Sequence, residues 1–176
     1  MTDDGSAPPA IDEATLERLR RGVPLTMDAM GRFALDGEPV THPRVIEAFR
    51  RGLDITEAGE HQLHVGNQWC YLTIDDCPLR ATAVLEGPRL RLDDGRALPL
   101  DPTTVWEEPG RGLRCAAPAI RSGRPLAVRF TNSAQMDLDR WLRWDEGEER
   151  ASLIIDGRTY EIGDRPPGNA GRSELP

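Results

Sequence analysis

Short alternating runs of apolar and polar residues dominate the chain and predict mostly β-strands. Three segments instead show the apolar spacing of helices. The apolar positions of these segments are Ile11, Ala14, Leu16 and Leu19, then Val45, Ile46, Phe49 and Leu53, and finally Ala134, Leu138, Trp141 and Leu142. Pairs of strand-like runs with turn residues between them precede and follow the second and third segments. The pattern therefore predicts an α+β fold.

The predicted elements occur twice in the same order, over residues 25–75 and residues 113–162. In each copy two short strands lead to a candidate helix N-cap, Thr41 or Thr131, and then to a helix and a polar loop. Each copy ends in a hairpin with a glycine-containing turn. The two turns are Gly66-Asn67 and Asp156-Gly157. We expect two similar hairpin–helix–hairpin units, although chance alone can give two short α/β segments the same order.

The stretch between the two copies predicts three further strands, at residues 80–85, 89–92 and 103–107. Gly-Pro, Asp-Gly and Asp-Pro pairs separate them, and their spacing predicts a β-meander that joins the two units. The expected division of the chain is a disordered tail at residues 1–10, an N-terminal α+β domain at 11–78, a C-terminal β-rich domain with one helix at 79–163, and a second disordered tail at 164–176.

Charge and composition narrow the functional classes. The net charge of -8 argues against a nucleic-acid-binding protein, because phosphate neutralisation needs a basic surface. The longest apolar runs, such as residues 153–155, are far too short to span a membrane. The N-terminus lacks the basic and apolar regions of a signal peptide, so we expect a cytoplasmic protein. All basic residues are arginine, which excludes lysine-dependent Schiff-base and phosphate-loop chemistry.

Motifs for catalysis or for metal binding are weak. The three cysteines, Cys70, Cys77 and Cys115, are an odd number and are expected to be free thiols. A zinc site at His61, His64, Cys70 and Cys77 is disfavoured, because His61 and His64 would point to opposite faces of one strand. A pair of Cys70 or Cys77 with His64 is the remaining candidate for a nucleophile and its base. We predict no catalytic residue, no metal and no cofactor.

Part of the chain resembles the bacterial family called domain of unknown function 1285 (DUF1285), mainly over residues 31–79. The positions that match that family's pattern in order are Gly37, Pro39, Val40, Pro43, Val45, Ile46, Phe49, Gly59, Leu63, Asp76, Pro78 and Leu79. The resemblance implies a duplicated-domain fold whose C-terminal half is similar to pleckstrin-homology domains. It also implies a role in signal transduction, in which a small ligand of nucleotide-like type is sensed between the domains, and it implies no established enzymatic activity. This chain departs from the family at His42, where the family has arginine, and at residues 65–69, where the family has Thr-Pro-x-Glu-Lys.

These observations lead to one main hypothesis and two alternatives. The main hypothesis is a non-catalytic ligand-sensing or regulatory module that binds a small molecule between its two domains. The residues expected to contact that ligand are His42, Arg44, His64, Trp69, Tyr71 and Asp76. One alternative is a protein–protein interaction module, whose surface is supplied by the pleckstrin-homology-like half or by Trp144, which lies off the apolar stripe of its helix. The other alternative is a small hydrolase or thiol enzyme. Neither nucleic acid nor a membrane is an expected partner.

Overall fold

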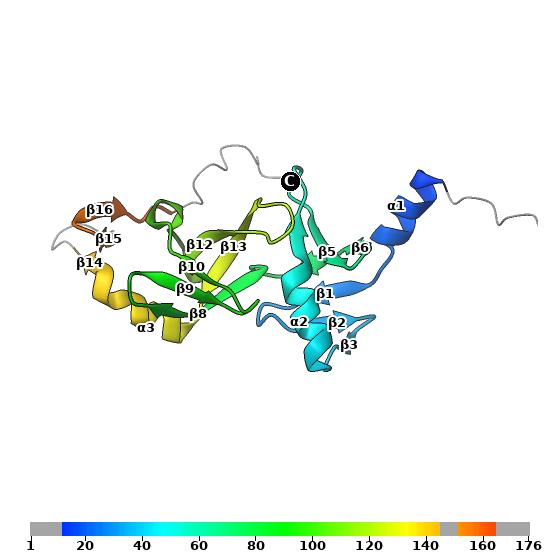
Figure 1. Ribbon diagram of the computed structural model, residues 1–176, viewed down its shortest axis with the longest axis horizontal. Coiled ribbons are helices and arrows are strands. Elements are labelled where there is room, and N and C mark those ends of the chain that lie inside the picture. The colour runs from blue at the N-terminus through cyan, green and yellow to red at the C-terminus, as the bar shows by residue number, and fades with distance from the viewer. Residues whose placement is uncertain (1–11, 145–150, 165–176) are drawn as a thin grey trace, which may run out of the picture.

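The computed structural model describes residues 12–144 and 151–164 and shows a mixed α+β protein with three α-helices. The molecule is elongated, with α1 at one end and β14–β16 at the other (Figure 1). The helices are α1 (Glu13–Arg21), α2 (Pro43–Gly52) and α3 (Asn132–Leu138), and two short 3-10 helices are η1 (Pro102–Thr104) and η2 (Asp139–Trp141). None of the described helices is both long enough and apolar enough to cross a membrane.

The strands form four sheets. The first half of the chain contains β1 (Leu25–Met27), β2 (Phe33–Leu35), β3 (Glu38–Pro39), β4 (Leu53–Ile55), β5 (His61–Val65), β6 (Gln68–Tyr71) and β7 (Thr73–Ile74). The second half contains β8 (Leu79–Leu85), β9 (Arg89–Leu92), β10 (Ala97–Pro99), β11 (Trp106–Glu108), β12 (Gly112–Pro118), β13 (Pro125–Phe130), β14 (Leu142–Trp144), β15 (Ala151–Ile155) and β16 (Arg158–Glu161). The strand orders are β3-β2-β1-β7, β4-β5-β6, β10-β9-β8-β13-β12-β11 and β14-β15-β16.

One order of elements occurs twice along the chain. Three strands, β1–β3, precede α2 and the antiparallel sheet β4-β5-β6, while β11–β13 precede α3 and the antiparallel sheet β14-β15-β16. After each three-stranded sheet the chain returns beside the first strand: β7 pairs in parallel with β1, and Gly163 forms a parallel bridge to Trp106 in β11. In this arrangement the second occurrence begins at β11, earlier than the strand expected to start at residue 113.

The six-stranded sheet corrects the position of one predicted strand. A meander of β8, β9 and β10 does follow the first occurrence, as β8 pairs antiparallel with β9 and β9 with β10. The strand expected at residues 103–107 does not continue it. Its counterpart β11 lies at the opposite edge of the sheet. β8 pairs in parallel with β13, so β13 and β12 lie between the meander and β11.

Two other expectations were wrong in detail. Thr41 does not cap α2. Because Pro43 takes the first helical position, the N-cap is His42, and the His42 side chain makes no capping hydrogen bond. Thr131 does cap α3, and its side chain accepts a hydrogen bond from Ala134 N. The polar loops expected after the second and third helices also begin with a short strand, β4 and β14 respectively.

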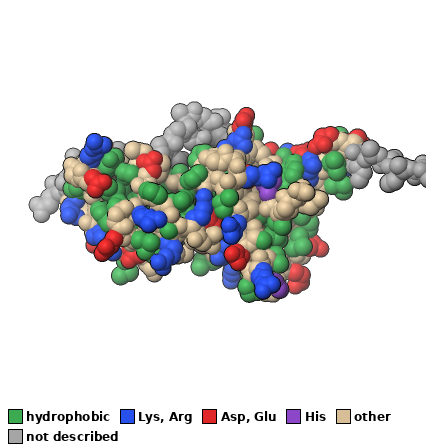
Figure 2. All heavy atoms as spheres, in the orientation of Figure 1, with side chains coloured by type: hydrophobic (Ala, Val, Ile, Leu, Met, Phe, Trp, Pro, Cys, Tyr) green, Lys and Arg blue, Asp and Glu red, His purple; other side chains and the backbone are tan. Residues whose placement is uncertain are grey.

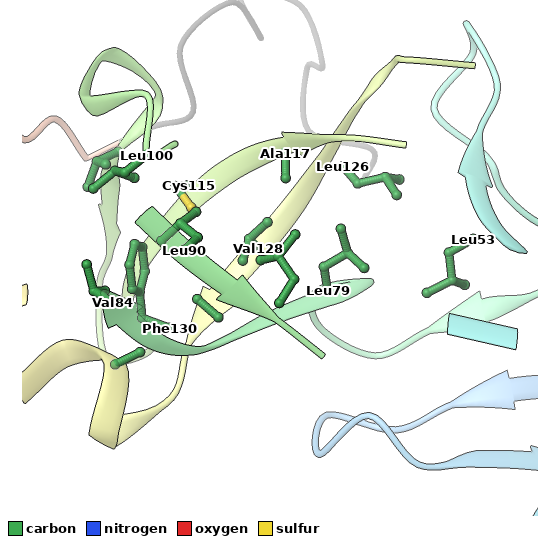
Figure 3. Packing of buried hydrophobic residues seen from close by; sticks show 14 of the residues in the cluster. Leu53, Leu79, Val84, Leu90, Leu100, Cys115, Ala117, Leu126, Val128 and Phe130 are labelled. Atoms are coloured by element: carbon green, nitrogen blue, oxygen red, sulfur yellow. The ribbon is translucent and has the colours of Figure 1, made fainter. Parts of the chain in front are cut away.

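A single cluster of buried apolar side chains runs through both halves of the molecule. Cys115, Val128 and Leu79, from β12, β13 and β8, are fully buried and form its centre in the larger sheet (Figure 3). Leu53 of β4 extends the same cluster into the N-terminal half. The two halves therefore share a core, which holds the loops between them in place.

Candidate functional site

Three arginines lie side by side across the centre of the six-stranded sheet. The register places Arg114 of β12 opposite Arg129 of β13, and Arg129 opposite Arg80 of β8. Residues that are directly opposite in a sheet point to the same face, so the three guanidinium groups form a row. Neighbouring residues on a strand point to opposite faces of the sheet. The adjacent row, Cys115, Val128 and Leu79, therefore points to the other face and belongs to the apolar core. We call Arg114, Arg129 and Arg80 the arginine row.

Two buried carboxylates, Asp76 and Asp93, pair with the arginine row. Asp76, in the loop after β7, accepts hydrogen bonds from Arg114 Nη2 at 2.8 Å and from Arg129 Nη1 at 3.2 Å. Asp93, in the turn after β9, accepts a hydrogen bond from the backbone N–H of Arg80 at 3.0 Å. Like charges that face each other across strands repel, so these carboxylates are needed for the row to form in a folded protein.

The loop between β1 and β2 covers the row from the N-terminal half. The carbonyl oxygen of Ala29 accepts hydrogen bonds from Arg80 Nη2 at 2.8 Å and from Arg129 Nη1 at 3.4 Å. Gly31 lies so close to the guanidinium of Arg80 that a Cβ atom there would overlap it, and its φ of 79° also favours glycine. The arginine row is therefore enclosed by both halves of the molecule.

Two further arginines and one glutamate complete the cluster. Arg50 of α2 pairs with Asp93 at 3.6 Å, and Arg111 approaches Asp76 at 4.0 Å. Glu108 of β11 lies 3.6 Å from Nε of Arg114. The network thus contains five arginines and three carboxylates, an excess of two positive charges in a chain whose net charge is -8.

Several guanidinium nitrogens in this cluster are buried without a hydrogen-bond acceptor. Within residues 12–144 and 151–164, no atom accepts a hydrogen bond from Nε or Nη1 of Arg114, from Nη1 of Arg80 or from Nε of Arg50. The side chain of Arg114 is only 1% exposed, whereas those of Arg129 and Arg111 are 33% and 59% exposed. Three of these nitrogens still lie 3.6–3.8 Å from a carboxylate oxygen of Asp93 or Glu108. Because buried polar groups are nearly always paired, Nη1 of Arg114 marks the place where an additional acceptor would be most stabilised.

Burial dominates the protonation equilibria around Arg80. It lowers the pKa of the Arg80 guanidinium, although Asp93 and Asp76 oppose that change. Burial also raises the pKa of the Asp93 carboxyl, against the hydrogen bond from Arg80 N and the charges of Arg50 and Arg80. Each group is therefore poorly hydrated, and an anion that reached this place would interact with the arginines in a low-dielectric environment.

The residues expected to bind a ligand fall into three separate places. Asp76 belongs to the arginine cluster. His64, Trp69 and Tyr71 come together on one face of β5 and β6, where the Trp69 ring stacks on His64 at 5.9 Å and meets Tyr71 edge-on at 5.3 Å. His42 and Arg44 are exposed at the start of α2.

The aromatic face of β5 and β6 is covered by α1. Arg20 lies over the Trp69 ring at 4.2 Å and Arg21 over the Tyr71 ring at 4.0 Å, and Arg21 also pairs with Glu60 at 2.7 Å. These cation–π contacts hold α1, which has no buried residue of its own, against the sheet. The aromatic side chains are thus engaged in packing a helix.

The thiols lie in surroundings that disfavour the thiolate. Burial raises the pKa of Cys77 to about 12 and also raises the pKa of Cys70 and Cys115. All three cysteines are free. A thiol nucleophile needs a lowered pKa, so these environments give no support to the thiol-enzyme alternative. Among the described residues no group of three or more His, Cys, Asp or Glu side chains is placed to hold a metal ion.

Sequence patterns did not identify the arginine row. Arg80 and Arg114 each stand within an apolar stretch that forms a buried strand, and an arginine at such a position is the signal that could have indicated a buried charge cluster. The face of the molecule shown in Figure 2 gives no comparable cue, because positive and negative side chains are intermixed on it over both halves.

No family model matches the chain, and no curated protein matches it significantly by sequence. Two solved structures are similar to it. A DUF1285 family protein from Silicibacter pomeroyi DSS-3 superposes with a TM-score of 0.59 at 16% sequence identity, over 80% of each chain. A DUF1285 family protein from Shewanella baltica OS155 superposes with a TM-score of 0.51 at 13% identity, over 68% of this chain and 92% of that one. The resemblance found in residues 31–79 is thereby confirmed at the level of structure: the chain has the fold of DUF1285 family proteins.

Proposed function

We propose that this protein is a non-catalytic regulatory module that binds a small anion, such as the phosphate of a nucleotide-like ligand, between its two halves. The observation that carries this proposal is the arginine row, whose buried nitrogens lack acceptors among the described residues. A phosphate oxygen accepts strong, charge-assisted hydrogen bonds from guanidinium groups and fits their planar pair of donors.

The most exposed members of the cluster provide the entry side. Arg111 and Arg129 are reachable from solvent, and Glu108, which is 45% exposed, lies against Arg114. An anion would approach past Arg111 and Arg129 and would take the place of Glu108 beside Arg114. The excess of positive charge in the cluster is two with Glu108 in place and three once Glu108 is displaced. It favours a ligand with about two negative charges, which suits a phosphate group.

The signalling step follows from which parts the cluster joins. Asp76 and Ala29 belong to the N-terminal half, whereas the arginine row belongs to the C-terminal sheet. An anion that competes with Asp76 for Arg129 weakens one tie between the halves and replaces it with its own contacts. A ligand shifts a conformational equilibrium only through such a difference in contacts.

The proposal also includes an origin by duplication, with domains at residues 11–78 and 79–163. The repeated order of elements supports it, and so do equivalent backbone bonds: Leu72 N donates to His61 O, and Ile162 N donates to Ala151 O. Both bonds close a hairpin at the same place. We also propose that residues 79–163, which are rich in β-strands and contain α3, are similar to pleckstrin-homology domains. Free cysteines support a cytoplasmic location.

A thermal unfolding series tests the anion site. The wild-type protein and the variants Arg129→Gln and Arg91→Gln are heated with increasing sodium pyrophosphate, at an ionic strength held constant with chloride, and then with purine mononucleotides. Arg91 is an exposed arginine on β9 and serves as the matched control. We expect saturable stabilisation of the wild type and of Arg91→Gln, and little or none for Arg129→Gln.

Two results would contradict the proposal. Equal stabilisation of all three proteins would show a general ionic effect. Failure of pyrophosphate and of every nucleotide to stabilise the wild type would leave the cluster with a purely structural role, as an ion-pair network between the halves.

A further inference from the structure

We propose that a groove in the C-terminal half, separate from the arginine row, binds a basic peptide segment of a partner protein. The groove has a volume of about 420 Å³ and lies where β11, β12, α3 and β14 approach one another. The side chains that matter for the argument are Glu107, Leu113, Met136, Asp139, Leu142 and Trp144.

Two large apolar side chains are unusually exposed in this groove. Met136 is 79% exposed and Trp144 is 64% exposed. Met136 points away from the core because α3 buries Ala134 and Leu138 on its opposite face. Single exposed apolar residues are common, but two that come from different elements and line one hollow are typical of a binding surface. Tryptophan and methionine are also favoured in protein interfaces, where methionine adapts its shape to the partner.

The charge of the groove selects the chemistry of the partner. Glu107 and Asp139 line it, and none of the described residues that line it is an arginine. The whole chain carries a net charge of -8, which attracts basic partners over longer distances. An arginine or lysine of the partner can pair with these carboxylates or stack on the Trp144 ring, while an apolar side chain lies beside Met136.

The same charges argue against other occupants. A second copy of this acidic chain would bring like charges together. Anionic lipid and nucleic acid would be repelled for the same reason. The arginine row lies on the other side of the sheet. Glu107 of β11 is opposite Leu113 of β12, and both line the groove. The residues that follow them, Glu108 and Arg114, point to the other face and belong to the arginine cluster.

Nuclear magnetic resonance can test the groove with a defined probe. The ¹⁵N-labelled full chain is titrated with a short capped peptide that has one leucine flanked by two arginines on each side, and with a matched peptide in which glutamates replace the arginines. We expect amide shift changes at the groove for the arginine peptide only. Met136→Ser should weaken binding by about fivefold or more, as truncation of an anchoring contact does.

The controls separate specific from general attraction. Met30→Ser changes a similarly exposed methionine outside the groove. Glu107→Gln removes a carboxylate of the groove and should also weaken binding of the arginine peptide, and Glu86→Gln is its matched control. Both controls should bind as the wild type does. The proposal is overturned if shift changes spread over the acidic surface and are equal in all variants, or if no peptide causes shifts at millimolar concentration. It is also overturned if sedimentation shows a dimer that Met136→Ser dissociates, since a second copy would then cover the groove.

Discussion

The two occurrences of the repeated order, residues 25–74 and residues 106–163, differ chiefly in the length of their first three strands. In the first, β1, β2 and β3 have 3, 3 and 2 residues; in the second, β11, β12 and β13 have 3, 7 and 6. In the second, β13 also accepts β8 as a neighbour, and the register of β12, β13 and β8 aligns three arginines. The same order of elements can thus support packing in one place and a charged site in another.

The helices of the two occurrences differ in how many of their residues are buried. α2 has ten residues and buries none of them fully, although Ile46 and Phe49 pack against the core and Phe49 meets Phe33 edge-on at 5.3 Å. α3 has only seven residues but buries Ala134 and Leu138 completely. The second occurrence therefore depends more on its helix than the first does.

The largest expected effect compares the two final hairpins. Leu63 and Leu153 occupy equivalent positions in β5 and β15 and are both buried. Leu63→Ala and Leu153→Ala should each lower the free energy of unfolding by about 2–5 kcal/mol, since each leaves a cavity. Urea unfolding measures the loss. Because one core joins both halves, each variant should still unfold in a single transition; a two-step curve would mean that the occurrences fold as independent domains.

The next comparison concerns the two threonines before the helices. Thr131→Ala removes a capping hydrogen bond and should cost about 1 kcal/mol. Thr41→Ala should change stability by less than about 0.5 kcal/mol, because Thr41 is exposed and caps nothing. Thermal or urea unfolding of the two variants is the measurement. Equal losses would show that Thr41 does cap α2 in solution.

A smaller effect is expected where α1 covers the first three-stranded sheet. Arg20→Gln removes the cation–π contact with Trp69, together with the exposed ion pair to Glu13, and should loosen α1 by about 0.5–1 kcal/mol. Amide hydrogen exchange of residues 13–21 reports this directly. Arg18→Gln provides the control, as Arg18 is exposed on the same helix. If exchange rises equally in both variants, helix charge rather than the aromatic contact holds α1.

The smallest effect is a difference in pH dependence between the hairpins. Burial lowers the pKa of His61, so the folded state favours the neutral ring. Its contribution to stability is present above about pH 6.5, the pKa of an unperturbed histidine, and is lost as pH falls through the lower folded value. His61→Ala gives this position the residue found at the equivalent Ala151 and should flatten the loss of stability between about pH 7 and pH 5. Urea unfolding across that range measures it, with His42→Ala as the exposed control; an unchanged slope in His61→Ala would contradict the assignment.

Local signals explain most of what the sequence could predict. Glycine-containing turns at Gly66-Asn67 and Asp156-Gly157 and the apolar stripes of the helices depend on neighbouring residues, and the structure has hairpins and helices there. The strands β4 and β14 were missed because each has three residues and includes a charged one, Asp54 or Arg143.

The arginine row could not be predicted in this way. Arg80, Arg114 and Arg129 come together only through the parallel pairing of β8 with β13 and the register of β13 with β12. Periodicity along one strand indicates which face a residue occupies, but it does not indicate which residue of a distant strand lies opposite. Of the six residues expected to bind a ligand, Asp76 alone lies in this cluster, and that it contacts a ligand stays a prediction.

The edge strand β11 has a thermodynamic consequence. Its consecutive residues serve opposite faces of the sheet: Glu107 lines the groove and Glu108 lies against Arg114. A ligand that displaces Glu108 from Arg114 and a ligand that binds at Glu107 act on adjacent residues of one strand, so we expect the two proposed ligands to be energetically coupled. Such coupling is reciprocal: whatever factor the anion applies to peptide affinity, the peptide must apply to anion affinity. Measuring either affinity with and without the other ligand would give the same coupling free energy.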